Sequence, residues 1–425
     1  MKKVLVGIFS LVVLTVGAQV SFAATSVDAL LEKLQDKGIL TRAEVLKLKG
    51  EIAADEKLGL DNNLKTSLPS WVNKLKLKGD IRTRFQYERK KNDTEARSRG
   101  RIRLRFGVEA DIAKNVKAGF GIATGSSADP RSTNQTLEND FEKPDARLDY
   151  AYGEWQAMDS LKLIAGKFNK TDYLWVPTDM LWDTDITPNG LSGSFQKEIV
   201  KNVTGTVSSG YWFLDENNKV DIRDPFLAYI QGVLGYKNDK FDAKMGSTYY
   251  GFSGLKAQCP EWTAGTNSGV TSGSSGACTG QLTYDYDSIG TSAEFGVNKL
   301  FGGLPLGIDD KIVIFGDFIH NISEGEITKS NGWSFGSRLG KAKLSAPKDW
   351  QVKYTYVNLQ TNAWPDFLPD SDRLAGGTNT FGHEVELQYL WKENLTLGLD
   401  YYKSNKITGA RNQEQIVQAD VNFKF

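Results

Sequence analysis

The sequence has little of the chemistry on which most enzymes and metal proteins depend. It holds 2 histidines and 2 cysteines in 425 residues, too few for a multi-ligand zinc site or an iron–sulfur cluster. Lys plus Arg and Asp plus Glu both number 52, so no overall charge excess points to nucleic acid. We therefore expect no enzyme activity, no cofactor, no metal site and no nucleic-acid partner.

Long apolar runs are also scarce. Two lysines precede an apolar run over 4–16, and Ser21 and Ala23 supply the small residues that a signal peptidase reads. We predict that 1–23 are a cleaved secretory signal; a retained membrane anchor is the alternative, but the run is short for a bilayer. No later stretch of about eighteen apolar residues occurs, which excludes a further transmembrane helix.

Aromatic residues and glycine are abundant instead. The chain has 10 Trp, 16 Tyr, 21 Phe and 42 Gly but only 11 Pro. Aromatic residues favour strands and glycine favours the turns between them, so a helical bundle is disfavoured. A chain of this length exceeds most single soluble cores, which leaves several domains or one very large closed sheet.

Residues 24–66 have a helical pattern. Gly38 stands where a helix C-cap is expected, and Thr41 followed by Glu44 is the signature of a capping box. Three leucines fall on one helical stripe: Leu30, Leu31 and Leu34. We predict a helical or coiled-coil segment of two short helices in the periplasm; a partly ordered spacer is the alternative, since short isolated helices are marginal in water.

After this segment, apolar and polar residues alternate strictly, and this pattern defines a β-strand region over 71–425. In 73–88 one parity is apolar (Leu75, Leu77, Ile81, Phe85, Tyr87) and the other is mostly basic (Lys74, Lys76, Lys78, Arg82, Arg84). The next strand sets Ile102, Leu104, Phe106 and Val108 against Arg101, Arg103 and Arg105. These strands run longer than the five or so residues usual in a soluble sandwich, and tilted membrane strands need that length.

The same alternation predicts sixteen antiparallel strands of a transmembrane β-barrel. We place them near 73–88, 101–112, 116–124, 146–156, 161–168, 191–199, 203–213, 226–236, 241–252, 286–298, 311–320, 331–342, 350–359, 379–391, 394–405 and 415–425. Short turns alternate with long loops at 125–145, 169–190, 253–285 and 360–378, as in outer-membrane barrels. The connection 299–310 is too long for its side, so fourteen or eighteen strands remain possible.

The last strand is amphipathic and closes on an aromatic residue. Val417, Ala419, Val421, Phe423 and Phe425 share one parity. This ending resembles the assembly signal of bacterial outer-membrane proteins, with Phe423 and Phe425 as its aromatic residues. The whole region resembles the putative porin family of Gram-negative bacteria, most specifically in KLKLKGDIRTRF at 74–85, in 149–155 and in LKLIAGKFN at 161–169.

This resemblance implies passive diffusion of small hydrophilic or charged solutes through a water-filled channel in the outer membrane. It further implies contact with outer-membrane lipid, insertion by the barrel-assembly machinery and a homo-oligomer, with a trimer possible. A structural protein remains the alternative, in which a closed barrel anchors the helical segment as a cell-wall tether. A secreted carbohydrate-binding β protein is a second alternative.

We expect the basic parity of the first two strands to line the pore: Lys74, Lys76, Lys78, Arg82, Arg84, Arg101, Arg103 and Arg105. Such dense like charge is tolerable in a water-filled lumen and costly in a packed core. The third external loop of classical porins folds inward. If the third external loop of this chain resembles it, its acidic residues face the arginines: Asp172, Asp179, Asp183 and Asp185. The rival acidic loop holds Asp129, Glu138, Asp140 and Glu142, and both loops could instead be ordinary surface loops.

Cys259 and Cys278 lie in a Gly- and Ser-rich stretch of an exported chain, so we predict that they form a disulfide. His320 and His383 fall near predicted strand ends, where lone histidines are mostly rim residues. Three Asp-x-Asp pairs lack the full calcium-loop spacing, and we expect no metal at them: 183–185, 285–287 and 370–372.

Overall fold

The computed structural model describes residues 34–37, 40–50, 75–126, 129–138, 140–141, 143–217, 223–273, 276–298 and 311–425. The chain divides into two units, Met1–Asn73 and Lys74–Phe425. The predicted signal peptide, most of the helical segment, Lys74, Glu142 and the connection 299–310 lie outside the described residues.

The first unit contains a helix at residues 42–50. The predicted capping box is confirmed at its start, because the Thr41 N–H donates to Glu44 Oε2 at 2.8 Å and the Glu44 N–H donates to Thr41 Oγ1 at 3.3 Å. Gly38, the expected C-cap, lies outside the described residues. None of the helices in the described part of the chain is long and apolar enough to cross a bilayer.

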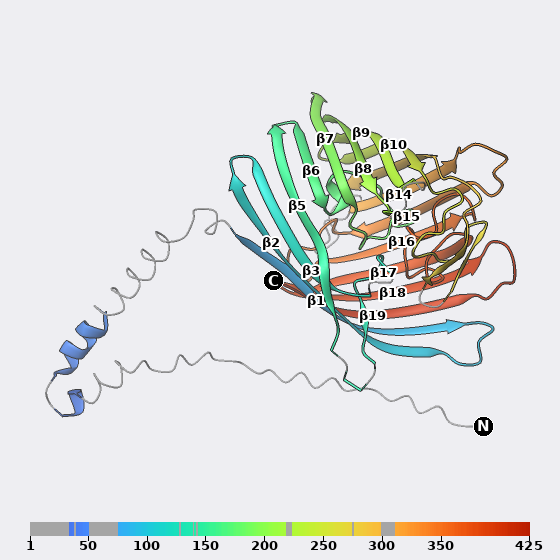
Figure 1. The fold of residues 1–425 in the computed structure, drawn as a ribbon. Helices are drawn as coiled ribbons and strands as arrows, with labels where there is room; N and C mark the ends of the chain where they lie inside the picture. The colour runs from blue at the N-terminus through green and yellow to red at the C-terminus, as the bar shows by residue number, and fades with distance from the viewer. Residues whose placement is uncertain are drawn as a thin grey trace. The chain divides into compact units, whose positions relative to one another are not determined.

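The second unit is a closed antiparallel barrel of sixteen long strands, as predicted (Figure 1). They are β1 (Lys76–Lys90), β2 (Arg97–Ala113), β3 (Val116–Thr124), β5 (Ala146–Met158), β6 (Leu161–Lys167), β7 (Asn189–Val200), β8 (Val203–Phe213), β9 (Phe226–Lys237), β10 (Phe241–Ser253), β13 (Ser288–Asn298), β14 (Lys311–Asn321), β15 (Asn331–Gly340), β16 (Trp350–Leu359), β17 (Thr380–Lys392), β18 (Leu395–Lys406) and β19 (Glu414–Lys424). A two-residue strand, β4 (Gln135–Thr136), adds to β2. β13 and β14 pair with each other, which keeps the described barrel at sixteen long strands.

The alternating apolar and polar residues of each strand lie on the outer and inner faces of the barrel, respectively. On β1 the apolar side chains Leu77 and Phe85 are 62% and 54% exposed, whereas Arg84 and Gln86 are 6% and 1% exposed. A soluble protein would show the reverse. Apolar residues on the outer surface and polar residues inside are what a bilayer requires of a barrel wall.

The seam that closes the barrel joins the first and last strands. β1 pairs with β19, and the pairing continues past the end of β19 because the N–H groups of Gly79 and Phe425 each donate to the other's carbonyl, at 2.9 and 3.0 Å. A Cβ on Gly79 would lie 2.7 Å from the Phe425 ring, so glycine is what lets this ring cover the seam. Closing the edge in this way removes unpaired backbone groups from the lipid.

The connections differ in length between the two ends of the barrel. Turns at 114–115, 159–160, 201–202 and 393–394 lie at one end, which we call the short-turn end. The other end, the long-loop end, carries 125–145, 168–188, 254–287 and 360–379. This asymmetry matches the sequence prediction and that of outer-membrane barrels.

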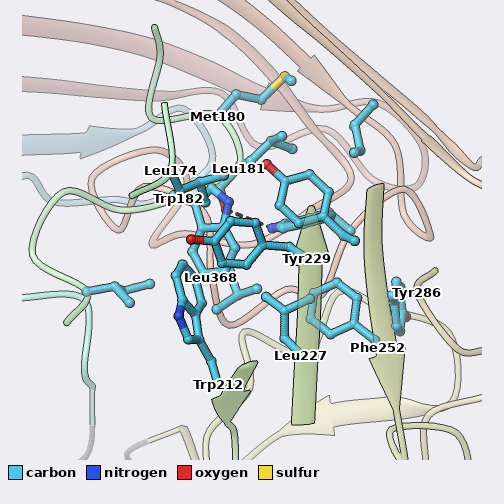
Figure 2. Packing of buried hydrophobic residues seen from close by; sticks show 14 of the residues in the cluster. Leu174, Met180, Leu181, Trp182, Trp212, Leu227, Tyr229, Phe252, Tyr286 and Leu368 are labelled. Carbon is cyan, nitrogen blue, oxygen red and sulfur yellow. Dashed lines mark hydrogen bonds between the residues drawn. The ribbon is translucent and has the colours of Figure 1, made fainter. Parts of the chain in front are cut away.

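Three of the long loops fold into the barrel and fill one side of its lumen. We call 168–188, 254–287 and 360–379 the inner loops. Their apolar side chains meet inward-facing residues of the strands, and Figure 2 shows this aromatic core around Trp182, Trp212 and Tyr229. The Trp182 ring lies edge-on to Trp212 at 5.4 Å and to Trp364 at 5.6 Å between centroids. The aromatic core therefore occupies part of the lumen beside β8–β10, and a cavity of about 430 Å³ borders the same strands.

Candidate functional site

The opposite side of the lumen carries a dense set of arginines, which we call the arginine wall. It comprises Arg82 and Arg84 of β1 and Arg99, Arg101, Arg103 and Arg105 of β2. The register of the two strands pairs Arg82 with Arg103 and Arg84 with Arg101, so the predicted neighbourhood of these residues is confirmed. Four guanidinium groups on adjacent strands repel one another unless carboxylates lie close to them.

Two carboxylates on the strands themselves supply part of this compensation. Asp80 on β1 pairs with Arg103 at 2.6 Å and with Arg105 at 2.8 Å. Asp420 on β19 pairs with Arg84 at 2.7 Å. Neither aspartate was predicted from the sequence to have this role. Their inward parity was readable, but the Asp420 pairing spans 336 residues and depends on barrel closure.

The loop 168–188 brings further carboxylates to the wall, as the sequence suggested. Asp185 lies 3.5 Å from Arg105 and accepts a 2.7 Å hydrogen bond from the Thr133 hydroxyl. Lys170 anchors the loop from within, because its buried ammonium donates to the carbonyl oxygens of Asp183 at 2.6 Å and Ile186 at 3.1 Å. The inward fold of this loop thus rests on internal hydrogen bonds as well as on ion pairs.

The acidic residues of this loop do not all reach the arginine wall. Asp183 accepts hydrogen bonds from the N–H groups of Asp185 and Ser371, both at 2.9 Å. Asp179 lies 3.6 Å from Arg373. Asp172 lines a cavity of about 530 Å³ together with Arg105, but its side chain is 68% exposed and its ion pair is with Lys162 at 3.9 Å. Asp172 stands on the short helix at the start of the loop, before the chain turns inward.

The loop 360–379 contributes charged residues that the sequence analysis did not assign to the pore. Asp372 lies 3.3 Å from Arg84. Arg373 is buried between loop and strand carboxylates, 3.2 Å from Glu384 on β17 and 3.6 Å from both Asp370 and Asp179. No local pattern marks this loop as inward-folding; its many polar residues at close spacing are the one available signal.

The carboxylates on β17 and β18 form a second charged surface beside β19. Glu384, Glu386 and Asp400 form the one group of metal-ligand type found among the described residues. Lys353 on β16 lies 3.2 Å from both glutamates. The cation beside these carboxylates is thus an ammonium group of the chain itself.

The local charges perturb the titration of the inner-loop carboxyls. Burial, aided by the neighbouring Asp185, raises the pKa of Asp183 to about 7. Burial alone would raise the pKa of Asp185 as well, but Arg103 and Arg105 lower it below its ordinary value. Asp372 shows the same balance: burial raises its pKa, while Arg84 and Arg101 outweigh burial and lower it. Burial likewise raises the pKa of Asp179 and of Asp370, so several inner-loop carboxyls are harder to ionise than usual.

A polar cavity of about 170 Å³, which we call the eyelet, lies between the arginine wall and the inner loops. It is lined by Arg82, Arg84 and Arg103 from the wall, by Asp179, Asp183, Asp185, Asp370 and Asp372 from the loops, and by Lys353, Glu384, Glu386 and Asp400 from β16–β18. Larger cavities of about 530 and 430 Å³ flank the loop 168–188. The eyelet adjoins the cavity of about 530 Å³ at Asp185 and is the smallest and most highly charged of the three.

The remaining basic residues predicted for the pore lie away from the eyelet. Lys78 pairs with Glu109 at 2.5 Å, and Lys76 lies 3.9 Å from Asp111, both near the short-turn end. Lys74 lies outside the described residues. The dense basic ladder is thus concentrated in the arginines.

The rival acidic loop, 125–145, contributes neutral groups to the wall. Asn134 accepts a 2.5 Å hydrogen bond from Arg82, and the Ser132 hydroxyl accepts one from Arg101 at 3.3 Å. Asp129 pairs with Arg131 of the same loop at 3.0 Å. Glu138 and Asp140 make no ion pair with a described arginine of the wall, and Glu142 lies outside the described residues.

The two cysteines meet in the inner loop 254–287. Cys259 and Cys278 are joined by a disulfide with a Cα–Cα distance of 5.7 Å, beside the small hairpin of β11 (Val270–Ser272) and β12 (Cys278–Gly280). Asp366 ties this loop to the next one, because it accepts hydrogen bonds from the Thr263 hydroxyl at 2.9 Å and the Thr266 N–H at 2.7 Å. The disulfide therefore constrains a loop that supports the aromatic core.

The histidines serve as hydrogen-bonding residues at the strand ends. His320 Nδ1 lies 2.8 Å from Asn331 Oδ1, and His383 Nδ1 lies 2.9 Å from the Tyr354 hydroxyl. Neither contact is the base–nucleophile pairing that a hydrolase would need.

Comparison with known proteins agrees with this architecture. A family model described as putative porin matches residues 87–282 and 279–425. OprB of Pseudomonas putida, in a high-pH structure, aligns with a TM-score of 0.55 at 11% identity over 84% of this chain and 96% of that chain. A triple mutant of the Rhodopseudomonas blastica porin aligns with a TM-score of 0.43 at 10% identity over 83% of this chain and 100% of that one. No protein of curated function matches the chain.

At such low identity the OprB likeness shows the fold, and the family match carries the assignment. Family and barrel together support a porin-like channel in the outer membrane rather than an enzyme. The match spans most of the barrel, from the long-loop half of β1 to the last strand. The chain belongs to the putative porin family.

Proposed function

We propose that the protein is a diffusion channel for small hydrophilic or charged solutes, and that the eyelet is its selectivity constriction. The observation that carries this proposal is a charged cavity enclosed by a barrel wall and inward-folded loops. Its volume, about 170 Å³, corresponds to roughly five water molecules, so small solutes fit it and large ones do not.

The two sides of the eyelet differ in charge. Arginines of β1 and β2 face one side, while carboxylates of β17, β18 and the inner loops face the other. Arg101, the register partner of Arg84, lies behind this lining in the arginine wall and makes hydrogen bonds to neutral oxygens of Gln86 and Ser132, so its positive charge adds to that side. Fixed charges in low-dielectric walls set up a transverse field that orients dipolar solutes and sorts ions.

The test is the reversal potential of single channels in a planar bilayer under a salt gradient. Replacing Arg101, Arg103 and Arg105 with Gln removes positive charge from the wall, and the reversal potential is expected to move towards cations. The matched change of Asp179, Asp183 and Asp185 to Asn is expected to move it towards anions. Normal insertion of both triple variants with an unchanged reversal potential would contradict the proposed constriction.

The alternative function is an outer-membrane anchor with a closed barrel. It should be tested because the aromatic core fills part of the lumen. Such a protein conducts no ions in the same bilayer experiment, so one measurement separates the two functions.

In the proposed setting the long-loop end faces outward, the helical segment lies in the periplasm, and the chain is inserted by the barrel-assembly machinery. The oligomeric state, with a trimer as the working expectation, is measured by native mass spectrometry.

A further inference from the structure

The outer surface of the barrel carries a local group of cations at the long-loop end of β1 and β18. Going towards that end, outward-facing residues on β1 read Phe85, Tyr87 and Arg89, and those on β18 read Leu399, Tyr401 and Lys403. Two strands thus repeat the order apolar, tyrosine, cation. Phe85 and Leu399 are 54% and 47% exposed, and both cations are exposed as well.

Strand register brings these cations into one neighbourhood. Arg89 pairs with Gln415 on β19, and Gln415 pairs with Lys403 on β18. Adjacent strands lie about 4.8 Å apart, so the two backbone positions are roughly 10 Å from each other, with a neutral side chain between them. Long Arg and Lys side chains can both reach a group placed over Gln415.

No carboxylate of the described chain neutralises the two cations. Neither Arg89 nor Lys403 has a carboxylate oxygen within 4.0 Å among the described residues. The nearest acidic residues in sequence, Glu88 and Glu414, have inward parity, and Lys90 lies 3.6 Å from each. The cations are therefore available to an external anion.

A third cation lies near this surface. Arg411, in the connection 407–413, lies over the ring of Phe381 with its guanidinium carbon 6.0 Å from the ring centroid. Phe381 is on β17, two positions beyond His383, and His383 is the register partner of Lys403. We call Arg89, Lys403 and Arg411 the outer cation group.

The outer surface of the other strands has different residues at the long-loop end. Many of its outward-facing residues there are large and apolar or aromatic, such as Phe213, Ile230, Tyr249, Ile289, Phe318 and Trp333. The outward-facing polar residues His320 and Asn331 are hydrogen-bonded to each other. A general preference for cations at the rim would have spread along all strands. The outer cation group is confined instead to the seam region of β1, β19 and β18.

We propose that this surface binds the phosphate of a lipid in the leaflet that surrounds the long-loop end. Tyrosines mark the level at which acyl chains meet headgroups, and the cations lie just beyond them. The apolar residues below, Phe85 and Leu399, match acyl chains, whereas the arginine matches phosphate through paired N–H donors. A surface that joins cations to apolar residues fits a lipid, which has both a phosphate and acyl chains. Free phosphate would need the cations alone.

The experiment measures retention of diphosphoryl lipid A by the folded, purified protein in zwitterionic detergent, using native mass spectrometry. The double variant Arg89→Gln, Lys403→Gln is expected to bind at least about tenfold more weakly, since each basic residue near a charged headgroup contributes to affinity. Lys197→Gln is the matched control, because Lys197 also faces outward on β7 but lies towards the short-turn end. It is expected to bind as the unmodified protein does.

Two comparisons make the result decisive. The heat-dependent gel shift of folded barrels shows whether each variant is folded, and a Gln residue at either exposed position leaves the strand pairing intact. A phosphate-free analogue with the same acyl chains is expected to bind weakly and equally to all three proteins. Equal retention of lipid A by the double variant, or complete displacement by millimolar inorganic phosphate, would overturn the proposal.

Discussion

The two sides of the lumen are built from the same alternating strands, yet they differ in what meets their inner face. On β8, β9 and β10 the inward residues include Trp212, Tyr229 and Tyr250, and the inner loops pack against them. On β1 and β2 the inward residues are arginines, and the inner loops touch them through carboxylates. Aromatic contact excludes water, whereas ion pairs leave polar space, so the eyelet forms where the loops meet charged strands and not within the aromatic core.

The closing seam lies on the charged side, so breaking it has the largest expected effect. Deleting Phe425 removes both backbone hydrogen bonds to Gly79 and exposes the edge of β1 to lipid. We expect most of the folded protein in outer-membrane fractions to be lost, while Phe425→Tyr retains it because the ring still covers Gly79. Normal folded yield of the deletion, measured by heat-dependent gel shift, would show that the seam closes without this residue.

Removing a central residue of the aromatic side tests whether packing holds the loops inside. Trp182→Ala leaves a cavity between Trp212 and Trp364 and is expected to cost about 3–5 kcal/mol of unfolding free energy. The loop 168–188 then occupies the lumen less, and we expect a several-fold increase in single-channel conductance. Trp182→Phe is the control that keeps most of the packing. An unchanged conductance in the alanine variant would mean that the ion pairs alone hold the loop.

A smaller effect is expected from pH on the charged side. Because the pKa of Asp183 is raised to about 7, the carboxyl is neutral at pH 6 and ionised at pH 8. Rising pH adds negative charge beside the arginine wall, so the reversal potential is expected to move towards cations. Asp183→Asn is expected to reduce this dependence, since burial also raises the pKa of Asp179 and Asp370.

The same raised pKa has a consequence for stability. Between about pH 4 and pH 7 the folded chain binds more protons at Asp183 than the unfolded chain does, so its contribution to stability falls as the pH rises through this window. The urea midpoint of Asp183→Asn is therefore expected to depend less on pH in that range than the midpoint of the unmodified protein.

The disulfide of the loop 254–287 is expected to have the mildest effect on conduction. Without prior reduction, alkylating reagents should leave Cys259 and Cys278 unlabelled. Replacing both with Ser is expected to lower stability by up to about 3 kcal/mol through loop-closure entropy, with a small rise in current noise as the loop gains freedom. Ready labelling of both thiols in the oxidised protein would contradict the pairing.

The outcome for the aspartates shows how far sequence reasoning reaches into the site. Asp185 was assigned to the arginines and lies 3.5 Å from Arg105, because a single inward-folded loop suffices to bring it there. Asp172 lies on the same loop and lines a cavity with Arg105, but it forms its ion pair with Lys162. Asp372 was not assigned to the pore from the sequence, yet it pairs with Arg84 at 3.3 Å. This contact joins β1 to a loop far along the chain.

The sequence by itself determined the barrel, because the two-residue period of a strand assigns every side chain to one of two faces. In a bilayer the apolar face is stable only against lipid and the polar face only against the lumen. Strand boundaries and the arginine wall follow from that local rule. Only the tertiary structure decided which carboxylates compensate the arginines, which loops enter the lumen and which cations gather at the outer seam. These depend on closure of β19 onto β1 and on aromatic packing between loops distant in the chain, and no local period encodes either one.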